Sequence, residues 1–225
     1  MAGFNFSSPS SAKEAIAIQN ELRDKVIIDD KYDPPLTIAG LDVGYDPAAG
    51  EAKAALVVMQ YDDLQIIEEI TATAKTDFPY IPGLLSFREI PAIQKIFEMI
   101  DTRPDMIIVD GQGIAHPRRL GIASHIGVLL DIPTIGVAKK KLCGAHDDLS
   151  LTRSSKTALM HHGERIGTVY RSRDNVKPIY ISPGHRIGND NAVLIVENML
   201  RGYKLPEPTR LADKLSKYSK EKLLV

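Results

Sequence analysis

Two short apolar runs with a helix-length segment between them constrain the fold of this chain most strongly. Residues 106–109 (MIIV) and 132–138 (IPTIGVA) have the composition of buried strands, and residues 118–130 between them are compatible with a helix. A strand, a helix and a second strand at this spacing predict a parallel crossover, because parallel neighbours cannot be joined by a tight turn. The sequence therefore predicts an α/β fold.

The segment before the crossover predicts three more strands, at residues 36–43, 54–60 and 65–73, arranged as an antiparallel meander. The last third of the chain predicts a strand pair at 164–171 and 178–182. Helices are expected over about 15 residues from residue 12, where Ser10 or Ser11 and Glu14 can form a capping box, and at 84–100, 189–201 and 209–222. We expect a single domain over 1–225, with a core at about 12–215 and a central mixed sheet of three antiparallel strands leading into parallel ones, flanked by helices.

Composition and missing motifs exclude several classes of protein. The single cysteine, Cys143, rules out an intramolecular disulfide and a cysteine-cluster zinc site, which leaves imidazole and carboxylate as metal ligands. The sequence has neither a phosphate loop of the GxxxxGK[ST] type nor a complete dinucleotide fingerprint. No signal peptide and no apolar run of membrane-spanning length is visible, so we expect a cytoplasmic protein without a membrane partner.

Carboxylates attached to apolar elements are the main chemical signal. Asp42 lies near the end of the first predicted strand, and Asp110 follows MIIV directly. A carboxylate beside a buried strand is costly unless it is paired or binds a metal. Each acid alone could cap a loop or pair with an arginine, but two acids at the ends of neighbouring strands favour a shared site.

Glu89 is the third candidate, on the helix predicted at 84–100. It could lie on a solvated helix face or pair with Arg88, or it could point at the other two acids if the helix packs on the sheet. An all-oxygen cluster of this kind suits Mg²⁺, with Mn²⁺ as a substitute, and such an ion can activate water for phosphoryl transfer. The three acids therefore indicate nuclease chemistry.

Four long blocks of the sequence stand out together: FPYIPGLLSFRE at 78–89, VDGQGIAHPRRLGIASHIG at 109–127, PTIGVAKKKLCG at 133–144 and LPEPTRLAD at 205–213. These blocks closely resemble the endonuclease V (deoxyribonuclease V) family of deaminated-base repair nucleases. The resemblance covers residues 12–215 and implies a ribonuclease H-like fold.

The resemblance assigns roles around the metal. Asp42, Glu89 and Asp110 match the family's metal-binding acids, and Asp213 matches a fourth position near the metal whose role is less defined. Lys139 matches a residue beside the scissile phosphate, where its charge can stabilise the transition state. His116 matches a position close to the active site, with a structural histidine that bonds its loop as the alternative.

The resemblance also implies a DNA-binding surface. Tyr80, held between Pro79 and Pro82 in a loop with Ile81 and Gly83, matches the wedge that enters the duplex where the damaged base leaves. A core aromatic in a rigid loop is the alternative for Tyr80. The other implied DNA-binding residues are three glycines that permit close approach of a flipped base, and two arginines: Gly111, Gly113, Gly121, Arg118 and Arg119.

By resemblance, the substrate is DNA containing deoxyinosine or another deaminated base. The reaction is a Mg²⁺-dependent nick at the second phosphodiester bond 3' to the lesion, leaving 3'-hydroxyl and 5'-phosphate. Whether one or two metal ions act stays open, as does inosine-containing RNA as a substrate; a non-catalytic nucleic-acid-binding module is the other-class alternative. We expect a monomer.

The net charge of −1 conceals an asymmetry along the chain. Residues 1–110 carry 9 Lys and Arg against 19 Asp and Glu, a balance of −10, and residues 111–225 carry 19 against 10, a balance of +9. Near-neutrality is therefore weak ground for excluding a nucleic-acid partner.

Overall fold

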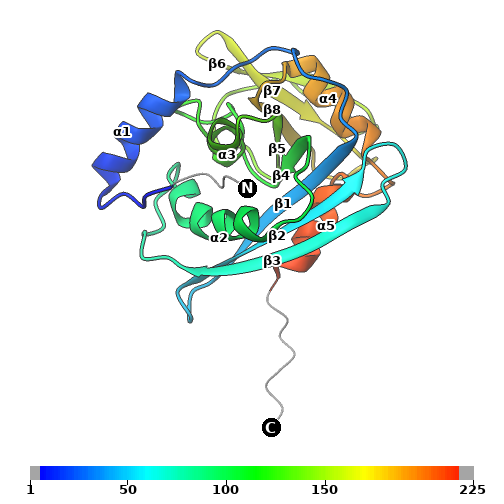
Figure 1. Ribbon diagram of the computed structural model, residues 1–225. Helices are drawn as coiled ribbons and strands as arrows, with labels where there is room; N and C mark the ends of the chain where they lie inside the picture. The colour runs from blue at the N-terminus through cyan, green and yellow to red at the C-terminus, as the bar shows by residue number, and fades with distance from the viewer. Residues whose placement is uncertain (1–5, 218–225) are drawn as a thin grey trace.

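In the part of the chain that the structure describes, a single sheet has eight strands in the order β3-β2-β1-β4-β5-β8-β7-β6 (Figure 1). The computed structural model describes residues 6–217. The strands are β1 (Thr37–Asp46), β2 (Glu51–Gln60), β3 (Ile66–Lys75), β4 (Met106–Val109), β5 (Thr134–Ala138), β6 (Lys156–His161), β7 (Glu164–Tyr170) and β8 (Ile179–His185).

The pairing directions confirm the expected mixed sheet. Strands β1, β2 and β3 form an antiparallel meander, whereas β1, β4 and β5 run parallel to one another. Strand β8 returns antiparallel to β5, and β7 and β6 extend the sheet in the same antiparallel manner. The predicted crossover between MIIV and IPTIGVA is therefore the parallel centre of the sheet.

Five helices are described, and four of them cover the two faces of the sheet: α1 (Ala12–Arg23), α2 (Ser86–Met99), α3 (Ile122–Leu130), α4 (Asn189–Asn198) and α5 (Glu207–Ser216). Helices α2 and α3 lie on one face, and α4 and α5 lie on the other (Figure 1). All four residues of β4 are buried because they alternate between these cores, with Ile107 and Val109 facing α2 and α3. Helix α1 packs through Ala15 against Phe78, Leu84 and Phe87.

Several boundaries differ from the sequence predictions. Strand β6 was not predicted, because it is a half-exposed edge strand with little apolar signal. Strand β1 continues beyond residue 43 to Asp46, since residues 43–46 pair with the start of β2, so Asp42 lies within the strand rather than near its end. Helix α1 has 12 residues instead of about 15, although the predicted capping box is present: Glu14 N–H bonds Ser11 Oγ, and the Glu14 carboxylate accepts from Ser10.

The helix predicted from residue 118 begins at Ile122, because the preceding residues form a turn in which Arg119 N–H bonds the His116 carbonyl. The terminal helix predicted to residue 222 is α5, which starts two residues earlier than predicted; its predicted end lies outside the described residues.

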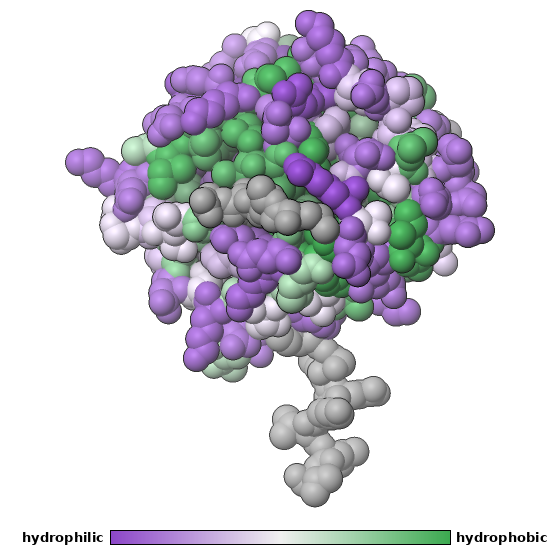
Figure 2. Space-filling view, viewed as in Figure 1, coloured by the Kyte–Doolittle hydropathy of each residue, from purple (hydrophilic) through white to green (hydrophobic). Residues whose placement is uncertain are grey.

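Hydrophobic residues gather in the region of α3, between α1 and α2, on the face shown in Figure 2. Hydrophilic residues surround them. Among residues 6–217, no helix has both the length and the apolar character needed to cross a bilayer.

Helix α5 lies unusually close to the sheet at Gly40. A Cβ at this position would be 2.0 Å from the carbonyl carbon and oxygen of Pro208, so only glycine lets the start of α5 rest on β1. Because α5 carries Asp213, this close approach helps to fix where that carboxylate lies relative to Asp42 on β1.

Replacing Gly40 by alanine should force α5 away from β1. Overpacking against backbone should lower the free energy of unfolding by about 3 kcal/mol or more, and displacement of Asp213 should weaken divalent-cation binding. Urea unfolding and Mn²⁺ titration measure the two effects. Gly50→Ala is the control: its added Cβ meets no atom within 4 Å, although its φ of +65° costs about 1 kcal/mol. Equal stability of Gly40→Ala and wild type would contradict the prediction.

Candidate functional site

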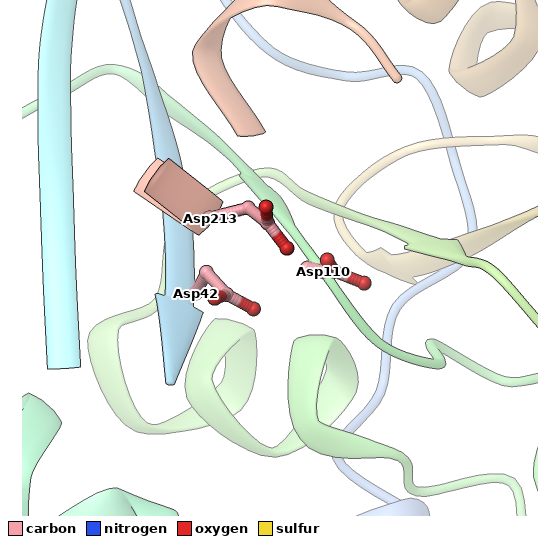
Figure 3. Close-up of side chains that lie close together, drawn as sticks. All are labelled: Asp42, Asp110 and Asp213. Atoms are coloured by element: carbon pink, nitrogen blue, oxygen red, sulfur yellow. The ribbon is translucent and has the colours of Figure 1, made fainter. Parts of the chain in front are cut away.

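Three aspartates from distant parts of the chain converge at the centre of the sheet (Figure 3). Asp42 lies in β1, Asp110 directly follows β4, and Asp213 lies on α5. Each offers a carboxylate oxygen within 4.8 Å of the other two. The parallel pairing of β1 with β4 continues to the Asp110 N–H, which bonds the Leu41 carbonyl at 2.9 Å, so the register of two strands places the first two acids together.

Lys139, the residue after β5, lies between two of these carboxylates. Its Nζ is 2.5 Å from Asp110 Oδ2 and 2.5 Å from Asp213 Oδ1. Burial alone would lower the pKa of Lys139, but the two ion pairs outweigh it and raise that pKa. Burial acts to raise the pKa of Asp213, but the ammonium groups of Lys139 and Lys217 act to lower it. The two lysines prevail, so the pKa of Asp213 lies below its usual value.

Glu89 on α2 is close enough to Asp42 and Asp110 to interact with their charges, and we call Glu89 and the three aspartates the acidic cluster. Burial, followed by the charges of Asp42 and Asp110, raises the pKa of Glu89 to about 8. Burial is also the main cause that raises the pKa of Asp42, and it raises that of Asp110 to about 6. Burial and mutual repulsion make these carboxyl groups resist ionisation. A bound cation would stabilise their ionised form, and carboxylate oxygens are the ligands that a hard divalent ion prefers. The acidic triad can therefore hold a metal ion, and Glu89 lies close enough to interact with two of its members.

Ser216 is a contributor to this centre that sequence reasoning missed. Its side chain is 1% exposed, and its hydroxyl donates a short hydrogen bond to Asp42 Oδ2. The Ser216 carbonyl also lies 2.7 Å from where a Cβ on Gly44 would be, so the end of α5 is in close contact with β1. The hydroxyl fixes the orientation of the Asp42 carboxylate. No local pattern links residues 42 and 216, so only the folded chain reveals this contact.

A cavity of about 340 Å³ adjoins the acidic cluster and shares Glu89 and Asp110 with it. The lining comes from α1, the 80–89 segment, the 110–122 segment and the loop after β5. Tyr80 lines the cavity and is nevertheless 67% exposed, so it is not the core aromatic that was considered as an alternative. The cavity also includes Pro82 and Gly83 of the same loop, whereas Pro79 and Ile81 flank Tyr80 outside the lining.

The contacts of His116 favour the structural alternative for this residue. Its Nδ1 accepts from the Arg118 N–H at 3.1 Å, which leaves Nε2–H to donate to the Gly83 carbonyl at 3.0 Å. Burial, and then the charge of Arg118, lowers the pKa of His116 to about 4, so the ring is neutral near pH 7. Both ring nitrogens thus bond backbone groups that shape the cavity.

The remaining predicted DNA-binding residues fall into two groups. Gly111 and Gly121 line the cavity; Gly113 does not, and a Cβ there would lie 2.0 Å from the Pro183 carbonyl of β8. The side chains of Arg118 and Arg119 bond other protein groups: Arg118 bonds the Gly83 carbonyl and Gln19, while Arg119 bonds Glu164 and His161.

An eight-stranded mixed sheet with carboxylates at its central parallel strands is the arrangement expected of a ribonuclease H-like nuclease. The family profile described as Endonuclease V matches residues 20–214, so the chain belongs to the endonuclease V family. Proteins named endonuclease V from Nostoc punctiforme and Trichormus variabilis are 51% and 52% identical to it over 209 residues, covering 92% of this chain and 95% of each relative.

Solved structures agree with this assignment. Endonuclease V from Streptomyces avermitilis has a TM-score of 0.88 and 40% identity, covering 95% of this chain and 94% of its own. Endonuclease V from Ciona intestinalis, in complex with a 24mer DNA containing an inosine followed by a ribo-adenosine, has a TM-score of 0.76 and 29% identity, covering 91% and 95%. The expected α/β fold and family are confirmed.

Removing the Ser216 hydroxyl should weaken metal binding. In Ser216→Ala the Asp42 carboxylate loses the donor that orients it, and loss of such an outer partner typically lowers metal affinity about tenfold or more. Mn²⁺ titration followed by electron paramagnetic resonance measures the affinity. Ser7→Ala, on an exposed part of the N-terminal segment, is the control. An unchanged Mn²⁺ affinity in Ser216→Ala would show that Asp42 does not need this bond.

Without divalent cation, stability should fall with rising pH, because Glu89 and Asp110 keep their protons in the folded state longer than in the unfolded chain. Between pH 4.5, the usual pKa of Glu, and about pH 8, the pKa of Glu89 in the folded protein, the folded protein holds a proton on Glu89 that the unfolded chain has lost. The free energy of unfolding therefore decreases as the pH rises across that range. Glu89→Gln removes this contribution and should lose less stability than wild type from pH 5 to pH 8.

Urea unfolding in chelator at the two pH values measures this difference. Glu98→Gln, at an exposed position on the same helix α2, serves as the matched control and should keep the wild-type pH dependence. Identical pH slopes for Glu89→Gln and wild type would contradict a raised pKa at Glu89.

Proposed function

We propose that this protein is a DNA repair endonuclease that recognises deaminated bases, chiefly deoxyinosine, and hydrolyses the second phosphodiester bond 3' to the lesion. The observation that carries the proposal is the shared wall between the acidic cluster and the cavity, formed by Glu89 and Asp110. A base-sized cavity beside a cation site suits an enzyme that reads a base at one point and cuts the backbone at another. The inosine-containing DNA in the Ciona intestinalis relative supports the same substrate class.

Asp42, Asp110 and Asp213 would supply the oxygen ligands for Mg²⁺, with Mn²⁺ as a substitute, and Glu89 would either complete the set or take a proton from the attacking water. A bound ion of this kind supplies Lewis-acid stabilisation of phosphate charge and lowers the pKa of water. Glu89 is buried close to Asp42 and Asp110, which places its carboxyl group where it could take a proton from water at the cluster. Lys139 is near enough to the acids to place positive charge beside the scissile phosphate. The products are a 3'-hydroxyl and a 5'-phosphate.

The cavity receives the flipped base, and Tyr80 fills the gap that the base leaves in the duplex. An exposed aromatic ring next to a cavity can replace lost stacking, and flipping a base costs only a few kcal/mol. Gly111 lines the cavity with backbone through which a base can be read by main-chain hydrogen bonds. Gly121 also lines the cavity, but its N–H bonds the Gly113 carbonyl and its carbonyl accepts from the His125 N–H, so its part is close packing. The side chains of Arg118 and Arg119 bond protein groups, but their positive charges add to those of the basic second half and favour approach of the phosphate backbone. We propose that the protein acts in the cytoplasm as a monomer.

Inosine-containing RNA is the second candidate substrate. The DNA bound to the Ciona intestinalis relative carries a ribo-adenosine after the inosine, so a site of this family accommodates a ribose next to the lesion. The same acids and cavity would serve either substrate, and a direct comparison of matched oligonucleotides separates them.

Purified protein with Mg²⁺ should nick an inosine-containing duplex and leave a matched undamaged duplex intact. Asp110→Ala should lower the nicking rate by at least about 1,000-fold, a loss of about 4 kcal/mol in transition-state stabilisation, while binding to inosine DNA in Ca²⁺ remains measurable. Gel mapping of the cut, with DNA and RNA oligonucleotides in parallel, gives the position and the preferred sugar. Asp62→Ala, at the exposed turn between β2 and β3, is the control. Cleavage by Asp110→Ala at the wild-type rate would refute the assignment.

A further inference from the structure

One backbone carbonyl next to the cavity accepts three side-chain hydrogen bonds. The Gly83 oxygen lies 2.9 Å from Gln19 Nε2, 3.0 Å from His116 Nε2 and 2.8 Å from Arg118 Nη2. A carbonyl oxygen has two lone pairs, and here three donors from two other segments share them. The Gly83 carbonyl is therefore held in place from two sides. Gly83 ends the loop that carries Tyr80, and its φ is +80°.

Gln19 is the centre of this arrangement. It is 1% exposed on α1, its Nε2 also donates to the Leu120 carbonyl at 3.3 Å, and its Oε1 accepts from Arg118 Nε at 2.5 Å. A buried amide is costly unless its donors and acceptor are bonded, and here they are. One side chain therefore joins α1, the Tyr80 loop and the segment that contains Gly121, and all three line the cavity.

The anchors of the Tyr80 loop lie on either side of an exposed residue. Phe78 is buried with Ala15 of α1 and Phe87, and the Gly83 carbonyl is bonded as described, whereas Tyr80 between them is 67% exposed. The direction in which Tyr80 points is therefore set by the two ends of a short loop rather than by packing of its own ring.

We propose that Gln19 is a positioning residue for lesion discrimination: with His116 and Arg118 it clamps the Gly83 carbonyl and so holds Tyr80 at the mouth of the cavity. Helix α1 thus contributes to the site through Gln19, although none of the three clustered aspartates lies on it. This inference rests on the proposed function for its consequence in catalysis, but the restraint on the loop is a property of the free protein.

Loss of the clamp should loosen the loop while leaving the acids in place. In Gln19→Leu the Gly83 carbonyl loses one donor, the Leu120 carbonyl loses another, and Arg118 Nε loses its acceptor. The chain has no tryptophan, so Tyr80→Trp introduces a single indole at the loop tip. Gln19→Leu in that background should give a clearly faster local anisotropy decay of the indole, and Asn20→Leu, at the exposed neighbouring amide on α1, should not.

In the wild-type loop, Gln19→Leu should lower the preference for inosine over undamaged DNA roughly tenfold, the equivalent of one hydrogen bond of about 1.4 kcal/mol, through KM more than kcat. Because the effect passes through Tyr80, the same substitution should change the preference little when added to Tyr80→Ala. Thermal melting identifies any loss of folding; should Gln19→Leu fail to fold, Gln19→Glu keeps the acceptor for Arg118 and still removes the donor to Gly83.

Unchanged anisotropy in both Gln19 variants would overturn the clamp, whatever the protein cleaves. Additive losses in the double variant with Tyr80→Ala would overturn its action through Tyr80. Absence of any nicking of inosine DNA by the wild-type protein would instead overturn the proposed function, while the anisotropy still decides whether the clamp exists.

Discussion

The repulsion and desolvation of buried carboxyl groups at the centre of the sheet is the constraint on which the rest of the site depends. Asp42, Asp110 and Asp213 lie together, with Glu89 near enough to feel two of their charges. Such a cluster is unfavourable in a protein interior unless positive charge or donors compensate. Lys139 and Ser216 supply that compensation within the chain itself, and a divalent cation would complete it.

The backbone positions the acids of this cluster in two ways. The parallel pairing of β1 with β4 brings two of the acids together, and the absence of a side chain at Gly40 lets α5 approach closely enough to deliver the third. The basic Lys139 follows the next parallel strand, β5. The three adjacent parallel strands β1, β4 and β5 thus contribute acid, acid and lysine close to where their mutual pairing ends, although β1 itself continues beyond Asp42.

The cavity proposed to receive a base and the acidic cluster proposed to cut the backbone are adjacent but separate. The cavity and the acidic cluster share Glu89 and Asp110, while Tyr80 and the Gly83 clamp lie on the cavity side. Under the proposed function, this separation would place the cut away from the base that is read. The contacts of His116 favour a structural role, because both of its ring nitrogens bond backbone groups that shape the cavity.

The sequence by itself determined the mixed α/β fold, the parallel crossover and three of the clustered acids, because strand periodicity is local and a charged residue within an apolar run is visible without a structure. The family resemblance added Asp213, Tyr80, His116 and Lys139. Only the tertiary structure decided that Asp42 lies within its strand, that Lys139 bridges two acids, and that Ser216 and Gln19 support the site. The Gln19–Gly83 and Ser216–Asp42 hydrogen bonds join residues 64 and 174 positions apart, and a local pattern indicates which side of an element is buried but not which distant group lies against it.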